Sequence, residues 1–424
     1  MNFNVINLGC KVNAYEAEST ARSLEQHGYT RVDNDGADIT IIYTCAVTNM
    51  AAQKSRKMIH RAKRNNPEST IVVAGCYSQI DPDALKEADI LIGTKHKSKL
   101  LDYLLEYEKN HERIVDIEKV DVLPFENMFV DQFDNQTRAY LKIQDGCNQF
   151  CTYCVIPFAR GRERSMAVND VLESVKMLQE KHSEIVLSGI HTGRYGRDIG
   201  MTLSSLLDEL LAISSEDFRF RISSIEMTEI DDHLIDLMKK DHRIARHFHI
   251  PLQSGCDTVL KRMNRPYTTK EFLERIEYIR KEIPGISIST DLIVGFPGET
   301  DEEFKKTCDF LKECQFSFLH IFPYSLRSGT KAASMENQID PKIKKKRAAI
   351  CADINEELYD KYKESYLDKE VTVLFEKDED GYTFGHSSEY LPVLVKGEYP
   401  RSTFVKVKIS ELKDHQLYGV KCEK

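Results

Sequence analysis

The stretch AYLKIQDGCNQFCTYC, residues 139–154, joins a short strand-like run to a loop that holds three cysteines. The run AYLKIQ (139–144) is followed almost at once by Cys147, Cys151 and Cys154. Five more strand-like runs follow it and alternate with helical patterns. Such alternation produces βα units with parallel strands, and six units predict a barrel or a partial barrel. The chemistry of such folds lies at the carboxyl ends of the strands, which is where these cysteines stand.

The other elements of this region are read from the same alternation. The further predicted strands are EIVLSGI (184–190), FRFRISS (218–224), HFHIPLQ (247–253), ISISTDLIVG (286–295) and FSFLHIF (316–322). Predicted helices include residues 168–182, 202–213 and 300–313. The last of these opens with Thr300 and then acidic residues, which is typical of a helix N-terminus.

The first ~110 residues repeat one pattern three times. Apolar runs end in a small turn and a cysteine at Cys10, Cys45 and Cys76, with helical stretches at residues 14–27 and 50–64 between them. Parallel strands end on one edge of their sheet, so the three cysteines are expected to face one crevice. A shared metal or cluster site is therefore predicted. Three unrelated core thiols are the alternative, because free cysteine is often buried.

The spacing CxxxCxxC in residues 147–154 differs from the patterns of the common metal sites. A zinc ribbon pairs two CxxC turns, and a ferredoxin supplies a fourth cysteine nearby. Three thiolates on one loop can hold three irons of a [4Fe-4S] cluster and leave the fourth iron open to a small bidentate ligand. A zinc site or a buried group of cysteines remains the alternative reading.

Composition and length set further limits. The chain has 424 residues and a net charge of −9, which argues mildly against nucleic acid unless basic residues are locally concentrated. The N-terminus MNFNVINLGCKVN has no signal-peptide pattern, and no apolar run approaches the roughly 20 residues of a membrane helix. A cytoplasmic protein without membrane contact is expected, with its eleven cysteines in a reducing compartment.

Both cysteine sets resemble those of one family. Cys147, Cys151 and Cys154, with the aromatic Tyr153 before the last, are similar to the cluster loop of the radical S-adenosylmethionine (SAM) superfamily. The stretches GCKVNAYE, IIYTCAVTN, VVAGCYSQ, DGCNQFCTYCVIPFARGRERS, HIPLQSG and DLIVGFPGETDEEF resemble the methylthiotransferases within it. The resemblance covers essentially the whole chain.

The resemblance implies an α/β protein of three parts. A Rossmann-like parallel sheet domain (1–112) and a linker (113–137) would precede a partial (β/α)6 radical-SAM barrel (138–364). The tail (365–424) alternates, is rich in Val, Tyr and Phe, and predicts a small antiparallel β-barrel similar to a TRAM domain.

The resemblance also implies a reaction and its cofactors. Two [4Fe-4S] clusters are expected, one auxiliary cluster on Cys10, Cys45 and Cys76 and one SAM-binding cluster on the second cysteine set. SAM would donate a methyl group and supply a 5′-deoxyadenosyl radical, so that a methylthio group is placed on C2 of an adenosine beside the tRNA anticodon. The resemblance implies a reductant protein such as flavodoxin or ferredoxin, but it does not indicate the sulfur source.

The substrate subtype rests on a few residues. GCKVN (9–13) and SGIHTGRYG (188–196) are similar to the type that acts on N6-threonylcarbamoyladenosine at position 37 of tRNA. Members that act on N6-isopentenyladenosine or on an aspartate of a ribosomal protein are the alternatives. An iron–sulfur carrier or electron-transfer protein is the alternative from another class.

The site residues follow from these expectations. The resemblance implies SAM contacts near the strand ends by Tyr153, Ser188, Gly189, Ser224, Glu226, Gln253 and Gly295. Substrate or RNA contacts are expected from Arg160 and Arg164, and from a basic helix face of Lys54, Lys57, Arg61 and Arg64 at helical spacing, for which a merely solvated face is the alternative. No catalytic residue is expected beyond the cluster ligands. His191, His247 and His249 are interpreted as hydrogen-bonded structural residues.

Overall fold

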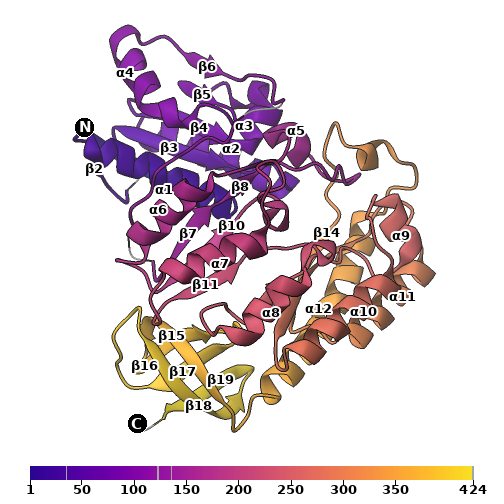
Figure 1. Ribbon diagram of the computed structural model, residues 1–424. Helices are drawn as coiled ribbons and strands as arrows, with labels where there is room; N and C mark the ends of the chain where they lie inside the picture. The colour runs from indigo at the N-terminus through magenta and orange to yellow at the C-terminus, as the bar shows by residue number, and fades with distance from the viewer. Residues whose placement is uncertain (35, 122–123, 135, 423–424) are drawn as a thin grey trace.

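The computed structural model describes residues 1–34, 36–121, 124–134 and 136–422, and it has three regions in chain order (Figure 1). The N-terminal region packs beside the central one, and the C-terminal region covers the far end of the central one. Within the described residues, no helix is both long enough and apolar enough to cross a membrane.

The N-terminal region is a parallel sheet of six strands in the order β2-β1-β3-β4-β5-β6. Its strands are β1 (Asn2–Asn7), β2 (Thr30–Arg31), β3 (Ile39–Thr44), β4 (Thr70–Gly75), β5 (Ile90–Ile92) and β6 (Ile114–Asp116). Its helices are α1 (Lys11–Gln26), α2 (Asn49–Asn65), α3 (Cys76–Ile80) and α4 (Leu100–Asn110). Every residue of the central strand β3 is buried, because helices cover both faces of the sheet. The predicted helices 14–27 and 50–64 correspond to α1 and α2.

The segment expected to be a linker, residues 113–137, differs from that expectation at its start. Strand β6 lies in this segment and pairs in parallel with β5, so that Ile114 lies opposite Ile90. Three residues of strand within a polar stretch are too few to show an apolar period in the sequence. The N-terminal sheet therefore extends past residue 112.

The central region is a partial barrel of six parallel strands. Two sheets, β11-β10-β7 and β12-β13-β14, are joined by parallel bridges from Phe220 to Ile244 and from Ser224 to His249. Its main strands are β7 (Arg138–Lys142), β10 (Glu184–Ser188), β11 (Arg219–Ile222), β12 (His247–His249), β13 (Ser287–Val294) and β14 (Phe318–Pro323), and a small ribbon pairs β8 (Gln144–Asp145) with β9 (Arg164–Ser165). All six predicted strands are found.

Helices surround this barrel (Figure 1). They are α5 (Ile156–Arg160), α6 (Val168–Leu178), α7 (Leu203–Ile213), α8 (Asp232–Lys240), α9 (Asp257–Arg262), α10 (Thr269–Glu282), α11 (Asp301–Cys314) and α12 (Pro341–Glu364). Short 3-10 helices occur in both regions. The N-terminal region has η1 (Pro82–Leu85) and η2 (Lys97–Lys99), and the central region has η3 (Thr192–Arg194), η4 (Met227–Glu229) and η5 (Lys331–Ser334). Helix α11 starts in a capping box of Thr300 and Glu303, which confirms Thr300 as its N-cap.

The C-terminal region is a closed barrel of five strands in the order β15-β16-β17-β19-β18. The strands are β15 (Glu370–Glu379), β16 (Tyr382–Ser387), β17 (Pro392–Lys396), β18 (Phe404–Lys413) and β19 (Gln416–Lys421). Four of the pairs are antiparallel as expected, whereas β17 and β19 are parallel. An odd number of strands cannot alternate in direction around a closed ring, so one parallel pair is required.

An arginine group joins this small barrel to the central region. Arg138 and Arg221 both contact the buried carboxylate of Glu184, at 2.5 Å and 3.0 Å. Arg138 also contacts Glu376 of β15 at 2.6 Å, and Arg221 donates to the carbonyl oxygen of Ser387 at 3.1 Å. The C-terminal barrel therefore sits at the end of the central barrel where the strands begin.

Candidate cluster sites and the adjoining cavity

Cys10, Cys45 and Cys76 meet at the carboxyl edge of the N-terminal sheet. Cys10 lies between β1 and the start of α1, Cys45 directly follows β3, and Cys76 is the first residue of α3 after β4. Burial raises the pKa of the Cys45 thiol to about 11, and the neighbouring Cys76 and Cys10 sulfurs add to this rise. The structure thus brings together three thiols that are far apart in sequence, as the strand pattern predicts.

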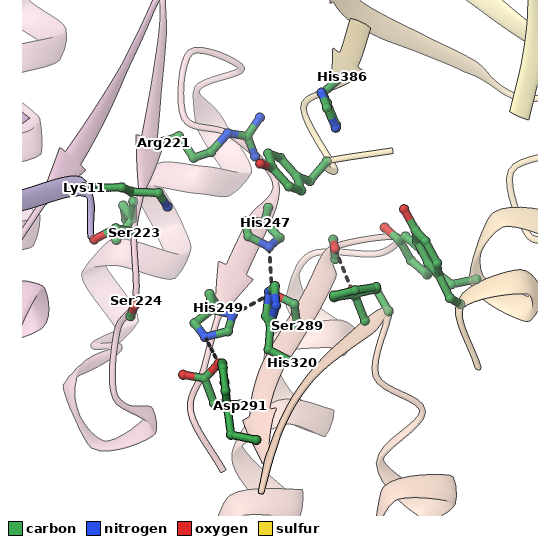
Figure 2. A pocket seen from close by; sticks show the side chains of 18 residues that line it. Lys11, Arg221, Ser223, Ser224, His247, His249, Ser289, Asp291, His320 and His386 are labelled. Atoms are coloured by element: carbon green, nitrogen blue, oxygen red, sulfur yellow. Dashed lines mark hydrogen bonds and ion pairs between the residues drawn. The ribbon is translucent and has the colours of Figure 1, made fainter. Parts of the chain in front are cut away.

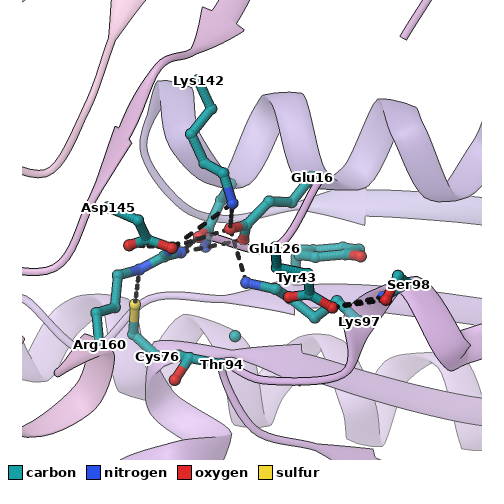
Figure 3. Close-up of polar contacts among 12 residues, drawn as sticks. Glu16, Tyr43, Cys76, Thr94, Lys97, Ser98, Glu126, Lys142, Asp145 and Arg160 are labelled. Atoms are coloured by element: carbon teal, nitrogen blue, oxygen red, sulfur yellow. Dashed lines mark hydrogen bonds and ion pairs between the residues drawn. The ribbon is translucent and has the colours of Figure 1, made fainter. Parts of the chain in front are cut away.

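Arg160 of the central region reaches into this site (Figure 3). It is fully buried, and its Nε donates a hydrogen bond to Sγ of Cys76 at 3.2 Å. Its Nη1 donates to Glu16 at 2.9 Å and to Asp145 at 3.1 Å, and its Nη2 donates to the side-chain oxygen of Asn13 at 2.6 Å. Arg160 therefore joins the two regions directly beside the first cysteine set.

Around Arg160 lies a buried charge hub. Figure 3 shows its members Glu16, Lys97, Lys142, Asp145 and Arg160, and Arg164 joins it through Asp145. Burial alone would raise the pKa of Glu16, but Arg160, Lys142 and Lys97 hold it well below its usual range. The hub has four cations and two carboxylates, and Glu126, which accepts from Ser98, adds one more carboxylate near Lys97. Positive charge thus remains in excess in the protein interior, where an unmatched charge is costly. Anionic thiolates at Cys76 would offset it.

The second cysteine set lies on the loop between β8 and α5. Cys154 donates its backbone amide to the carbonyl oxygen of Cys151 at 3.0 Å, which closes a tight turn. The amides of Gln149 and Ile156 donate to Sγ of Cys147 and Cys154, both at 3.4 Å. Burial raises the pKa of Cys154 to about 12, with the Cys151 and Cys147 sulfurs adding to the rise. A metal binds cysteine as the thiolate, so cluster binding must displace the proton of a thiol such as Cys154.

Two cationic side chains contact this cysteine set, and the sequence did not reveal either contact. Arg265, which is buried, donates from Nη1 to Sγ of Cys151 at 3.3 Å. His191 places Nδ1 at 3.5 Å from Sγ of Cys147 and Nε2 at 2.9 Å from Glu229. Burial lowers the pKa of His191, but Cys147 and Glu229 outweigh it and raise the pKa to about 10. His191 is hydrogen-bonded, as expected, and one of its contacts is a cysteine of the set, whereas nothing in the sequence pattern indicated Arg265.

Both sites fit an iron–sulfur cluster held by three cysteines. Each offers three thiols from loops at strand ends, and each has a guanidinium donor on one of its sulfurs. Hydrogen bonds to cluster sulfurs are a standard way for proteins to tune such clusters.

Among the described residues, the ligand group compact enough for a single ion is His96, Asp116 and Glu118, which lies apart from both cysteine sets in sequence.

Three of the predicted SAM contacts lie beside the second cysteine set or the cavity. Glu226 is ion-paired with Arg265, which in turn contacts Cys151. Tyr153 is half-buried and packs against the apolar group around Phe296. Ser224, after β11, is exposed to the cavity described below.

The other four predicted contacts have backbone roles. Ser188 directs its hydroxyl to the carbonyl oxygen of Val186 at 3.2 Å. A Cβ atom at Gly189 would lie 2.9 Å from the Gln144 side chain, so only glycine fits there. Gln253 and Gly295 have positive φ angles of 69° and 70° at turns that follow their strands.

Two of the predicted substrate contacts are corrected by the structure. Arg160 and Arg164 were expected to meet a carboxylate or phosphate of the substrate, but both are buried. Arg164 donates to Asp145 at 2.9 Å and to the carbonyl oxygen of Arg160 at 2.7 Å. Both guanidinium groups do bind carboxylates, but these belong to the protein itself. A sequence motif shows a cation and not the direction in which its side chain folds.

The predicted basic face is present on α2. The exposed residues of this helix include Lys54, Lys57, Arg61 and Arg64, whereas Ala52, Ser55, Ile59 and Ala62 on the opposite side are buried. The alternation follows the helical period, so the four cations lie together on the surface.

A cavity of about 500 Å³ lies within the central barrel (Figure 2). Side chains from β11, β12, β13 and β14 form its walls, and His386 of the C-terminal barrel lies at one end with the ring of Tyr390 stacked on it. Lys11, the residue after Cys10, reaches into it from the N-terminal region. The cavity therefore has walls from all three regions.

Comparisons with known proteins agree with this arrangement. Two family models match the chain, the radical SAM superfamily over residues 141–311 and the uncharacterized protein family UPF0004 over residues 2–93. Threonylcarbamoyladenosine tRNA methylthiotransferase MtaB of Bacillus subtilis is 41% identical over 415 residues, which are 95% of this chain and 92% of that protein. The MtaB of Aquifex aeolicus is 39% identical over 377 residues, which are 87% of this chain and 91% of that protein.

Solved structures share the fold. The radical SAM methyltransferase TsrM from Kitasatospora setae superposes with a TM-score of 0.58 at 12% identity, over 78% of this chain and 74% of that one. At this identity the likeness speaks for the architecture of the chain alone.

Proposed function

The chain belongs to the MtaB family of tRNA methylthiotransferases, and on this premise we propose that it transfers a methylthio group to C2 of N6-threonylcarbamoyladenosine at position 37 of tRNA. SAM serves both as the methyl donor and as the source of the radical. The observation that carries this proposal is the pair of three-cysteine sites, one in each of two packed regions, with Arg160 of the central region bonded to Cys76 of the other.

The cofactors are SAM and two [4Fe-4S] clusters. We assign the SAM-binding cluster to Cys147, Cys151 and Cys154, and the auxiliary cluster to the N-terminal cysteines Cys10, Cys45 and Cys76. When bound, these groups supply the radical, the methyl group and the sulfur that an unactivated C–H position requires. We also assign SAM contacts to Tyr153, Ser188, Gly189, Ser224, Glu226, Gln253 and Gly295.

The chain's own side chains position and insulate these groups. Arg160 and Arg265 each direct a charged donor at a cysteine sulfur, and such donors favour the anionic form of their acceptor. The buried charge hub holds the two regions together, because Lys142 and Arg160 of the central region both pair with Glu16 of the N-terminal region. The side chains thus set the charge state and the distance of the two sites before any substrate arrives.

The substrate is tRNA, and we propose that it is held by its anticodon stem-loop. The exposed cations Lys54, Lys57, Arg61 and Arg64 of α2 support a contact with the phosphate backbone. Cations that neutralise phosphates release counterions, so the affinity should fall as the salt concentration rises. A reductant protein such as flavodoxin or ferredoxin and a cytoplasmic location complete the proposal.

Nucleoside mass spectrometry of total tRNA from cells with and without the gene tests the proposal. Loss of 2-methylthio-N6-threonylcarbamoyladenosine in the deletion strain is the expected result. Loss of the 2-methylthio-isopentenyl form instead would support the proposed reaction and show that the assigned substrate is wrong. If neither nucleoside changes, the assignment to tRNA is wrong.

A further inference from the structure

The cavity in the central barrel runs along the strands. In β13 its lining residues extend from Ser287 at the start of the strand to Asp291, which at ~3.3 Å per residue is a length of about 13 Å. Ser224, a proposed SAM contact, lies on the wall. Tyr390 is stacked on His247, the first residue of β12, and so lies at the end where the strands begin. The cavity is thus deep enough for a base with a long substituent.

Two cations and one carboxylate line this cavity: Lys11 and Arg221 lie together at one end, whereas Asp291 lies away from them and is paired with His249 at 3.2 Å. Lys11 is exposed to the cavity, and in the described part of the chain it has no hydrogen bond or ion pair. Arg221 lies beside it, but shares the carboxylate of Glu184 with Arg138 and Arg219 (Figure 2).

Polar side chains of β12 and β13 lie on the cavity wall with the two cations. His247 Nε2 and His249 Nδ1 both contact the Ser289 hydroxyl, at 2.9 Å and 3.0 Å. His247 is buried, and its other nitrogen, Nδ1, has no hydrogen-bond partner among the residues that the structure describes. Its ring is stacked on Tyr390 with a centroid distance of 5.1 Å. Buried polar atoms are normally paired, so this nitrogen points to a polar ligand that completes the site.

We propose that this cavity receives the N6 substituent of the modified adenosine, and that Lys11 binds its carboxylate with Arg221 behind it. The inference rests on the proposed function and deepens it, because it names the residue that selects the substrate. A threonylcarbamoyl group carries a carboxylate, a hydroxyl and a urea. A cation, imidazole nitrogens and serine hydroxyls are the matching partners.

The place of Lys11 in the chain agrees with the geometry of the base. In adenine, C2 and the N6 amino group lie on the same edge, on either side of N1. In the chain, Lys11 directly follows Cys10, one of the thiols assigned to the auxiliary cluster. An adenine edge that presents C2 to the sulfur donor on the Cys10 side would therefore present its N6 substituent to the Lys11 side chain.

The same groups reject an isopentenyl substituent. An apolar chain in this cavity would leave the Lys11 amine and the free nitrogen of His247 without partners, and each unpaired buried polar group is costly. Sites built around hydrogen bonds reject analogues that lack the bonding group far better than they reject a change of size. The preference should therefore depend on the carboxylate charge.

Fluorescence anisotropy with the cluster-loaded protein tests this inference without turnover. The probes are three anticodon stem-loops that carry at position 37 the threonylcarbamoyl group, its methyl ester or unmodified adenosine. We expect the wild-type protein to bind the acid about tenfold or more tightly than the ester, as for a charged hydrogen bond. Lys11→Gln should abolish this preference and Lys11→Arg should keep it, while Lys240→Gln on the exposed end of α8 should change nothing.

Other outcomes overturn the inference. Equal binding of acid and ester by the wild-type protein does so without any variant, so the test holds even if Lys11→Gln loses iron. An equal loss of affinity for all three RNAs in Lys11→Gln would make Lys11 a general phosphate contact. Failure of the proposed function is a separate result, since it would appear as no methylthio transfer to the threonylcarbamoyl stem-loop by the wild-type enzyme.

Discussion

The Nε atom of Arg160 donates a hydrogen bond to Sγ of Cys76 at 3.2 Å, across the contact between the N-terminal and central regions. Arg160 is the last residue of α5, the short helix that begins directly after the Cys147–Cys154 loop. One short helix therefore carries a cation from one cysteine set to the other. The same guanidinium binds Glu16 and Asp145, so the distance between the two sites is fixed by buried charge.

Removal of the Arg160 charge should loosen this junction. In Arg160→Met, Glu16 and Asp145 lose a buried partner, and breaking a buried ion pair costs about 3–5 kcal/mol. We expect a lower thermal midpoint and a loss of iron from the N-terminal site, measured by calorimetry and iron analysis. Arg160→Lys should recover part of both.

Arg197→Met is the matched control, because Arg197 is exposed and lies outside the hub. It should leave the midpoint and the iron content unchanged. If Arg160→Met behaves like this control, the junction does not depend on the charge of Arg160.

Arg265 should set the reduction potential of the SAM-binding cluster. Its guanidinium contacts Sγ of Cys151, and a cation there favours the more negative reduced state. We expect Arg265→Gln to lower the potential by about 50–100 mV, equivalent to the loss of one charged hydrogen bond. A redox titration followed by electron paramagnetic resonance measures it.

Loss of Arg265 also frees the carboxylate of Glu226, which would push the potential in the same direction. The double variant Arg265→Gln/Glu226→Gln separates the two effects. An unchanged potential in both variants would show that the contact with Cys151 has no electronic role.

Acid should weaken the attachment of the C-terminal barrel. Burial raises the pKa of Glu376, but His386 and Arg138 outweigh it and lower the pKa to about 2. A carboxyl with a lowered pKa stabilises the folded protein above its unfolded pKa, and this contribution is lost as the pH falls. Between pH 5 and pH 3, we expect Glu376 to account for a loss of about 1–3 kcal/mol in the free energy of unfolding.

Urea unfolding of the metal-free protein followed by circular dichroism checks this pH dependence. The destabilisation caused by Glu376→Gln should be large at pH 7 and small at pH 3, because the wild-type carboxyl is then largely protonated when the chain unfolds. Glu398→Gln, at an exposed position of the same barrel, is the control. A Glu376→Gln effect that is the same at both pH values would rule out the ion pairs as its source.

The basic face of α2 should contribute electrostatically to tRNA binding. We expect Lys54→Glu/Lys57→Glu to reduce affinity at low salt about tenfold or more and to make the salt dependence shallower, because fewer counterions are released. Filter binding at several salt concentrations measures both quantities. Lys239→Glu/Lys240→Glu on α8 makes the same charge change elsewhere. An equal effect of this control would show that the α2 face contributes only non-specific electrostatic attraction.

The sequence predicted that the N-terminal cysteines lie close together, because the topology of the sheet alone determines where they are placed. Strands that run in parallel end on one edge, so Cys10, Cys45 and Cys76 had to meet once β1, β3 and β4 were read as neighbours. Strand β6 escaped prediction, because three residues show no period. The parallel pair in the C-terminal barrel escaped too, since strand pattern does not show how a ring closes.

Side-chain direction was not predictable in the same way. Arg160 and Arg164 read as accessible cations near the cysteine loop, yet both turn inward to Asp145. Arg265 carries no motif and reaches Cys151 only because the chain after α9 returns to the loop. Lys11 entered the sequence argument as one letter of a subtype motif, and the cavity now supplies a physical reason for it.

The most direct test of the account is a single-turnover assay with the reconstituted holoenzyme, SAM, a reductant and an anticodon stem-loop that carries N6-threonylcarbamoyladenosine. The account predicts a product heavier by one methylthio group in place of hydrogen at C2, seen by nucleoside mass spectrometry. Cys147→Ala should abolish both this product and 5′-deoxyadenosine, whereas Cys10→Ala should abolish the product alone. Methylthio transfer to an isopentenyladenosine stem-loop instead, or identical behaviour of the two cysteine variants, would contradict it.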